Sequence, residues 1–229
     1  LAIIPAFNEG DSIALVIADL CLHEPDCDIV VVDDHSSDDT ARRVLESGAG
    51  LLPLPFNLGI GGAVQTGFRY ARRMGYRIAF QFDGDGQHSG EDVQRLLEPL
   101  LAGTADVVVG SRFLEGGGYQ STTLRRVGIR LFEGLNRLTS GRHLSDTTSG
   151  FRAYNAGAID FLADNYPSDY PEVESLTQLT RAGFRIAEVP VTMRERQAGV
   201  SSISTLQSFY YMAKVSLASV VSMGKPWRR

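Results

Sequence analysis

Short apolar runs alternate with amphipathic segments through the first half of the chain, and this alternation limits the possible folds more than any other feature. Runs typical of β-strands cover residues 1–6, 28–34, 51–54, 77–82 and 106–110. Helical patterns lie between them, over residues 12–22, 40–46, 63–74 and 91–101. Repeated strand and helix units build a mostly parallel central sheet flanked by helices, so the predicted fold class is α/β.

The pattern loosens after residue 112. A glycine-rich loop covers residues 115–119, helices are predicted over 123–138, 156–164 and 171–181, and a strand over 185–193. The apolar segment 206–223 is followed by a basic tail of Lys225, Trp227, Arg228 and Arg229. We therefore expect a domain over 1–205 and a C-terminal helix with its tail over 206–229, which packs on the domain or lies in the membrane interface.

Composition narrows the functional classes. The formal net charge of −5 gives no general attraction to nucleic acid, so we expect no nucleic-acid partner. The spacing of Cys21 and Cys27 fits neither a redox pair nor a zinc knuckle, which favours structural thiols in a reducing compartment. The first residues lack the pattern of a signal peptide, and we expect a cytoplasmic location.

Two carboxylates one residue apart follow the fourth predicted strand, in the sequence Asp83-Gly84-Asp85. Side chains two apart in an extended chain point the same way, and glycine lets a ligand approach the backbone closely. The two carboxylates can therefore share one ion, and Mg²⁺ or Mn²⁺ prefers such oxygen ligands and leaves positions for substrate phosphates. Gln87 could add an oxygen and His88 a nitrogen. Taken alone, the same motif equally describes a solvated turn.

Further polar groups close the first two strands. Asn8 and Glu9 follow the first, and Asp33 and Asp34 end the second. Each segment alone is typical of a capped helix start. Together they place many carboxylates at one sheet edge, where mutual repulsion requires cations, hydrogen-bond donors or ligand hydroxyls. The ribose and base of a nucleotide would supply such donors.

A glycine-rich segment over residues 57–63 fits no dinucleotide-binding motif. Counting from Gly59, the sixth position of GxGxxG is Val64, and the segment does not follow the first strand. The chain also contains no GxxxxGK[ST] sequence, which excludes a P-loop nucleotidase. The glycines, Gly61 among them, are interpreted as allowing close approach of a ligand at a helix start.

Seven segments in order, PAFNEG, VVDDHSSDDT, NLGIGGA, DGDGQH, GSRF, SDTTSGFRAY and VPVTMRERQAGVSS, resemble family 2 glycosyltransferases. The resemblance covers almost the whole chain and is closest to the branch of dolichyl-phosphate mannose synthase and bacterial polyprenyl-phosphate sugar transferases. It implies a GT-A type nucleotide-diphospho-sugar transferase fold. It also implies metal-dependent, inverting transfer of a sugar from UDP or GDP to a polyprenyl or dolichyl phosphate.

The resemblance further implies roles for single residues. Those expected to bind the nucleotide sugar are Pro5, Ala6, Asn8, Glu9, Asp33, Asp34, Gly61, Gly84 and Arg112. Those expected to hold Mg²⁺ or Mn²⁺ on the diphosphate are Asp83, Asp85 and Gln87. Three arginines, Arg112, Arg152 and Arg196, would face donor or acceptor phosphates. Asp146 matches the acid often proposed as a base or as a group that orients the acceptor.

Two departures from the family pattern bear on the acceptor. Ser202 stands where the mannose synthase branch commonly has lysine, and many relatives continue into transmembrane helices. Membrane recruitment, at the inner face of the membrane, would then depend on the terminal helix or on a membrane protein partner. A homo-oligomer is also compatible with the sequence.

Other functions stay open at this point. A phosphate acceptor is already anionic, so Asp146 would only position groups, whereas a hydroxyl acceptor would need Asp146, Glu172 or Glu174 as a base. The alternatives are a transferase with a saccharide or other soluble acceptor, and a non-catalytic nucleotide-sugar-binding subunit of a membrane assembly. The choices between UDP and GDP, and among sugars, depend on contacts that spacing does not supply.

Overall fold

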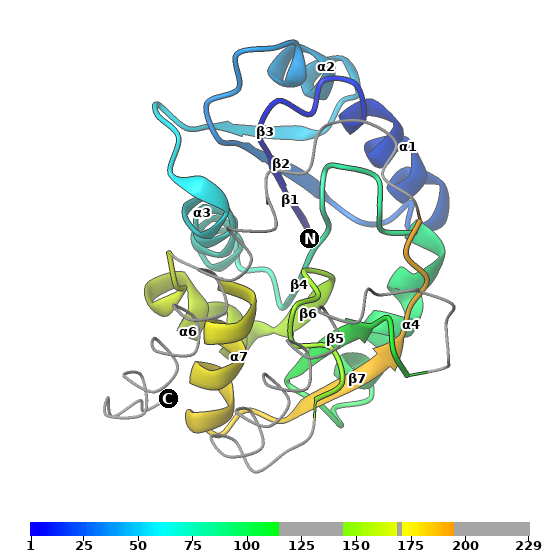
Figure 1. Ribbon diagram of the computed structural model, residues 1–229, viewed down its shortest axis with the longest axis vertical. Coiled ribbons are helices and arrows are strands. Elements are labelled where there is room, and N and C mark those ends of the chain that lie inside the picture. Colours follow the sequence, from blue (N-terminus) through cyan, green and yellow to red (C-terminus); the bar gives the residue numbers. More distant parts are fainter. Residues whose placement is uncertain (115–143, 169–170, 195–229) are drawn as a thin grey trace, which may run out of the picture.

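A computed structural model describes residues 1–114, 144–168 and 171–194 (Figure 1). Within them a seven-stranded sheet has the order β3-β2-β1-β4-β6-β5-β7. The strands are β1 (Ala2–Ala6), β2 (Ile29–Asp33), β3 (Gly50–Pro53), β4 (Ile78–Gln81), β5 (Val107–Ser111), β6 (Arg152–Asn155) and β7 (Ile186–Pro190). Strand β6 runs antiparallel to β4 and β5, and the other neighbouring pairs are parallel. The predicted α/β fold with a mostly parallel sheet is confirmed.

Helices cover both faces of the sheet. They are α1 (Ile13–His23), α2 (Thr40–Glu46), α3 (Gly59–Met74), α4 (Val93–Leu101), α6 (Ala156–Asn165) and α7 (Pro171–Arg181), with a 3₁₀ turn over Gly90–Asp92. Figure 1 shows α3, α6 and α7 together on one side and α1 and α4 on the other. The apolar side chains divide in the same way, because one buried cluster joins α3, α6 and α7 to the sheet and another joins α1, α2 and α4.

Successive side chains of one strand pack alternately into the two buried clusters. In β1, Ile3 packs toward α3, whereas Ile4 packs toward α1, and in β2 Val30 and Val31 divide in the same way. Successive strand residues point to opposite faces, so a strand covered on both sides must be apolar throughout. This requirement explains why the sequence pattern identified these strands as continuous apolar runs.

The order in which the chain adds strands to the sheet reverses between β1 and β4. Strand β1 pairs with β2 over five positions but with β4 only at Ala2 and Ile3. Pro5 lies beyond the pairing with β4, where its missing N–H group removes no ladder hydrogen bond. Strands β2 and β3 extend from β1 to one side and the remaining strands to the other. Such a switch point, at the carboxyl ends of parallel strands, is where α/β sheets bind ligands.

Two elements differ from the sequence prediction. No element was predicted over the residues of strand β6, because four residues are too few to show a periodic pattern; pairing with β4 and β5 creates the strand. Helix α3 begins at Gly59, four residues before the predicted start. A Cβ atom on Gly61 would lie 2.5 Å from the carbonyl oxygen of Pro167, so close backbone packing requires the glycine there.

Several predictions lie outside the described residues. They are the glycine-rich loop over 115–119, the helices over 123–138 and 206–223, the basic tail, and the positions of Arg196 and Ser202. Within the parts of the chain that the structure describes, no helix combines the length and apolar character needed to cross a membrane.

We expect Gly61→Ala to lower the free energy of unfolding by about 1–3 kcal/mol, because a new methyl group would overlap a neighbouring backbone. Gly157→Ala is the matched control, since a Cβ atom there would meet its nearest neighbour at 3.6 Å. That variant should be neutral or stabilising by up to about 1 kcal/mol, because alanine favours helix α6. Urea denaturation measures both changes, and equal midpoints for the two variants would contradict the packing argument.

Candidate functional site

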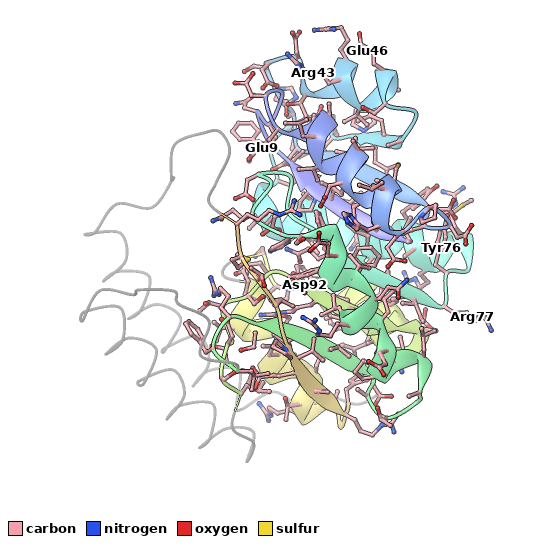
Figure 2. The ribbon with its side chains drawn as sticks, turned by 90° about the vertical axis from the view of Figure 1, so that its right-hand side faces the viewer. Glu9, Arg43, Glu46, Tyr76, Arg77 and Asp92 are labelled. Atoms are coloured by element: carbon pink, nitrogen blue, oxygen red, sulfur yellow. The ribbon has the colours of Figure 1, made fainter. Side chains whose placement is uncertain are left out.

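The predicted site residues that the structure describes gather mainly at one edge of the sheet. This edge holds the carboxyl ends of the parallel strands and the amino end of antiparallel β6. Figure 2 shows Glu9, which follows β1, on the opposite side of the molecule from Tyr76 and Arg77, which precede β4. The loops after β1, β2, β4 and β5 therefore meet the loop that enters β6.

Asp83 is supported by a buried histidine. The Asp83 backbone N–H donates to Nδ1 of His88 at 3.0 Å, and Nε2 of His88 lies 3.5 Å from Oδ2 of Asp83. The imidazole is buried and stacks on Phe151 with ring centroids 4.7 Å apart. Burial lowers the pKa of His88, so the ring is neutral at pH 7 and carries its proton on Nε2. His88 thus holds Asp83 in place, instead of offering the nitrogen ligand that the sequence suggested.

The loop that carries Asp85 is held from two sides. Oδ1 of Asp85 accepts from the N–H of Gln87 at 3.0 Å, which closes a tight turn. The Ser12 hydroxyl lies 2.7 Å from the Gly84 carbonyl oxygen, and the Arg194 N–H donates to the Gln87 carbonyl at 2.8 Å. Segments after β1 and after β7 therefore restrain the same turn.

The donor set at this turn fits a hard divalent cation that shares its coordination with a substrate. The Asp83 side chain is 34% exposed at the sheet edge, and Asp85 follows it by two residues. Among the described residues, no three His, Cys, Asp or Glu side chains come together as a complete metal site. Mg²⁺ and Mn²⁺ commonly bind through one or two carboxylates, with water and phosphate oxygens as the remaining ligands. Two carboxylates are sufficient for that mode.

The loops expected to bind a nucleotide are joined by hydrogen bonds. Asp33 and Asp34 are buried, and their Oδ1 atoms accept from the N–H groups of Ser36 at 3.1 Å and Leu58 at 2.7 Å. Asn8 adopts a left-handed backbone with φ of 56°, and its Oδ1 atom accepts from the N–H of Ser37 at 2.8 Å. The loops after β1, β2 and β3 therefore form one connected unit around the ends of these strands.

Arg112 and Asp146 form a buried ion pair. Nε and Nη2 of Arg112 donate to the two Asp146 oxygens at 2.6 and 2.7 Å, and Nη2 also donates to Oγ1 of Thr148 at 2.7 Å. Burial favours the neutral acid, but the hydrogen bonds and charge of Arg112 outweigh it and lower the pKa of Asp146. Asp146 is therefore a weak base that orients a guanidinium group.

Arg152 donates hydrogen bonds to two backbone carbonyls. Its side chain is buried at the start of β6, where Nη1 donates to the Glu172 carbonyl at 2.7 Å and Nη2 to the Thr147 carbonyl at 2.9 Å. The guanidinium thus joins the loop before β6 to the start of helix α7. Burial also raises the pKa of Glu172, whereas Glu174 accepts from the Gln178 amide at 3.3 Å.

Sequence reasoning missed one close contact between the two halves of the site. A Cβ atom on Gly150 would lie 3.0 Å from Nε2 of Gln81 and 3.1 Å from Oδ2 of Asp83. The loop before β6 therefore lies against the Asp83 carboxylate. The glycine inside SDTTSGFRAY was the only sequence signal, and no pattern connected it to Asp83.

Comparison with known proteins places these features in a family. The model of Glycosyl transferase family 2 matches residues 1–162. Undecaprenyl-phosphate mannosyltransferase of Micrococcus luteus is 37% identical over 213 residues, which cover 89% of this chain and 87% of the relative. Polyprenol monophosphomannose synthase of Mycolicibacterium smegmatis is 31% identical over 214 residues, which cover 89% of this chain and 80% of the relative.

The fold is also similar to that of a solved enzyme. Glucosyl-3-phosphoglycerate synthase of Mycobacterium tuberculosis was crystallised with Mn²⁺, UDP-glucose and phosphoglyceric acid. The TM-score is 0.70 at 25% identity, and the match covers 97% of this chain and 78% of the solved chain.

We expect Asp146→Asn to lower the free energy of unfolding at pH 7 by about 3 kcal/mol, because it leaves the Arg112 charge uncompensated in a buried site. The pKa of Asp146 is lowered in the fold, so its contribution is complete above about pH 4 and is lost as the pH falls through the folded value. The difference between wild type and variant in urea denaturation should therefore shrink from pH 7 to pH 3. Asp164→Asn, at an exposed ion pair with Arg72, is the control and should change little. A difference that did not vary with pH would argue against the pair.

Proposed function

The chain belongs to glycosyl transferase family 2, and we propose that it transfers a sugar from a nucleoside diphosphate to a polyprenyl phosphate. The reaction inverts the anomeric carbon and uses a divalent cation. Support for the acceptor comes from the two relatives, an undecaprenyl-phosphate mannosyltransferase and a polyprenol monophosphomannose synthase. Support for the cation and for a nucleotide sugar comes from the solved enzyme, which binds Mn²⁺ and UDP-glucose.

The donor half of the site is the edge around β1, β2 and β4. Asp83 and Asp85, with Gln87 on the same turn, would hold Mg²⁺ or Mn²⁺ on the diphosphate. When bound, the cation acts as a Lewis acid and stabilises the charge that develops on the leaving diphosphate. The joined loops that carry Asn8 and Asp33 would contact the base and ribose, together with Pro5, Ala6, Glu9 and Asp34.

The acceptor half is the edge around β5 and β6. An oxygen of the acceptor phosphate attacks the anomeric carbon, the bond from that carbon to the diphosphate breaks, and the nucleoside diphosphate leaves. A phosphate is anionic at neutral pH and needs no general base. The observation that carries the proposal is the Arg112–Asp146 pair. Its carboxylate is a poor base, but it orients a guanidinium group of the kind that binds phosphate oxygens.

A phosphorylated soluble acceptor is the second candidate. It is favoured by the solved enzyme, which was crystallised with phosphoglyceric acid beside UDP-glucose. If a hydroxyl of such an acceptor attacks, Glu172 is the candidate base, because burial raises its pKa toward the working pH.

For the lipid acceptor, we propose that residues 206–229 keep the catalytic domain, residues 1–205, at the membrane surface.

A substrate panel distinguishes these functions. GDP-mannose, UDP-glucose and UDP-N-acetylglucosamine are each incubated with undecaprenyl phosphate, with phosphoglyceric acid or with a mannose oligosaccharide, in the presence of Mn²⁺. We expect a glycolipid product and no product with the other two acceptors. Product with phosphoglyceric acid alone would show that the acceptor is a soluble phosphorylated molecule and not the lipid phosphate. No product in any arm would favour a non-catalytic binding subunit.

We expect Asp85→Asn to weaken the Mn²⁺-dependent part of UDP or GDP binding by about tenfold or more, because an amide is a poorer metal ligand than a carboxylate. Isothermal titration with Mn²⁺ and with a chelator isolates this part. Asp164→Asn, on α6 and away from the turn, should bind as the wild type does. Equal binding by wild type and Asp85→Asn would remove the metal assignment.

We expect Gly150→Ala to weaken the same Mn²⁺-dependent binding by about tenfold, since the new methyl group would displace the Asp83 carboxylate. Gly157→Ala adds the same methyl group on α6, where its nearest neighbour would lie at an ordinary contact distance of 3.6 Å, and should leave binding unchanged. Binding of both variants at the wild-type level would show that the position of the loop before β6 does not affect the donor site.

A further inference from the structure

Glu188 on β7 holds the loop that carries Asp146. The Ser145 N–H lies 2.9 and 2.8 Å from the two oxygens of Glu188, and the Asp146 N–H donates to Oε1 at 2.9 Å. The Ser145 hydroxyl also donates to Oε1, at 3.0 Å. Three donors on two consecutive residues therefore converge on one half-buried carboxylate.

This carboxylate is connected to Arg112 through Asp146. Glu188 lies opposite Val109 of β5 in the parallel register, three residues before Arg112. Its bond to the Asp146 backbone fixes the residue whose own carboxylate receives Nε and Nη2 of Arg112. A second connection joins the same loop to β5, because Oγ of Ser111 lies 2.6 Å from Oγ of Ser145. The direction of the guanidinium therefore depends on contacts to both β5 and β7.

The chemistry at position 188 is specific to a carboxylate. An ionised carboxylate only accepts hydrogen bonds, so it can face two backbone N–H groups and a hydroxyl together. A glutamine of nearly the same shape keeps one acceptor oxygen, but its NH₂ group would face an N–H donor. The substitution therefore changes hydrogen bonding at this loop while it hardly changes volume.

We propose that Glu188 is a positioning residue for Arg112. It holds the amides of Ser145 and Asp146, and the Asp146 carboxylate then directs the guanidinium toward a substrate phosphate. The inference rests on the proposed function, because it requires that Arg112 contacts a phosphate of the donor or of the acceptor.

A double-mutant cycle tests this role in the full chain. Glu188→Gln should lower kcat/KM for transfer about tenfold in the wild-type background. In the Arg112→Lys background the same change should cost less than about twofold, since the group that Glu188 positions is already altered. An equal loss in both backgrounds would show a general structural effect and overturn the proposal.

Asp106→Asn is the matched control. Asp106 accepts several hydrogen bonds, from Asn155 and Arg185, beside the amino end of β5. Its substitution should lower stability in urea without a change in kcat/KM. A tenfold loss of kcat/KM in Asp106→Asn would mean that any weakened carboxylate in this sheet affects transfer, and it would also overturn the role of Glu188.

Binding measurements separate failure of this inference from failure of the proposed function. UDP with Mn²⁺, GDP with Mn²⁺ and farnesyl phosphate are titrated into wild type, Glu188→Gln and Arg112→Lys. Glu188→Gln should weaken the ligand that Arg112→Lys weakens, whether or not the wild type transfers sugar to any acceptor. The inference fails if Arg112→Lys weakens none of the three ligands, or if Glu188→Gln leaves the affected ligand unchanged.

Discussion

Strand β6 runs against its neighbours β4 and β5, and the geometry of the site depends on this reversal. The first residue of an antiparallel strand lies at the edge where parallel strands end. The loop that enters β6 therefore meets the loops that leave β4 and β5. Its Gly150 backbone lies against Asp83, and its Asp146 carboxylate binds Arg112. A parallel strand at this position would have placed the same loop at the opposite edge of the sheet.

Backbone amides explain how so many carboxylates gather at one edge. Asp33 accepts from Ser36, Asp34 accepts from Leu58, and Glu188 accepts from two successive amides. The sequence interpretation required cations, hydrogen-bond donors or ligand hydroxyls for the charges of Asp33 and Asp34, and the chain's own backbone amides supply such donors. Each acid then organises a loop, because an N–H group bound to a carboxylate fixes the backbone that carries it. In this glycosyltransferase, Asp33 and Asp34 are buried, whereas the Asp83 side chain remains one-third exposed beside the turn.

Much of the fold was predictable, because the pattern that identifies most helices and strands lies within each segment of the sequence. Helices α2 and α7 were predicted with the bounds that the structure shows, since an amphipathic period is present within each segment. Strands β1, β2, β4 and β5 were identified because both of their faces are covered, which requires continuous apolar runs. Strand β6 and the first turn of α3 were missed because neighbouring segments create them. The glycines that open α3 disfavour a helix locally, and the contact with residues 167–168 explains Gly61.

The sequence by itself determined the family, the α/β class and the turn that carries Asp83 and Asp85, because these depend on the order and spacing of residues along the chain. Only the tertiary structure decided the partners of these groups. In the structure the Arg152 side chain is buried and donates to the Thr147 carbonyl. His88 accepts a hydrogen bond from the Asp83 backbone, and Glu188 accepts one from the Ser145 amide, 43 residues away in the chain. Such pairings depend on which strands become neighbours in the sheet, and a one-dimensional pattern does not contain that information.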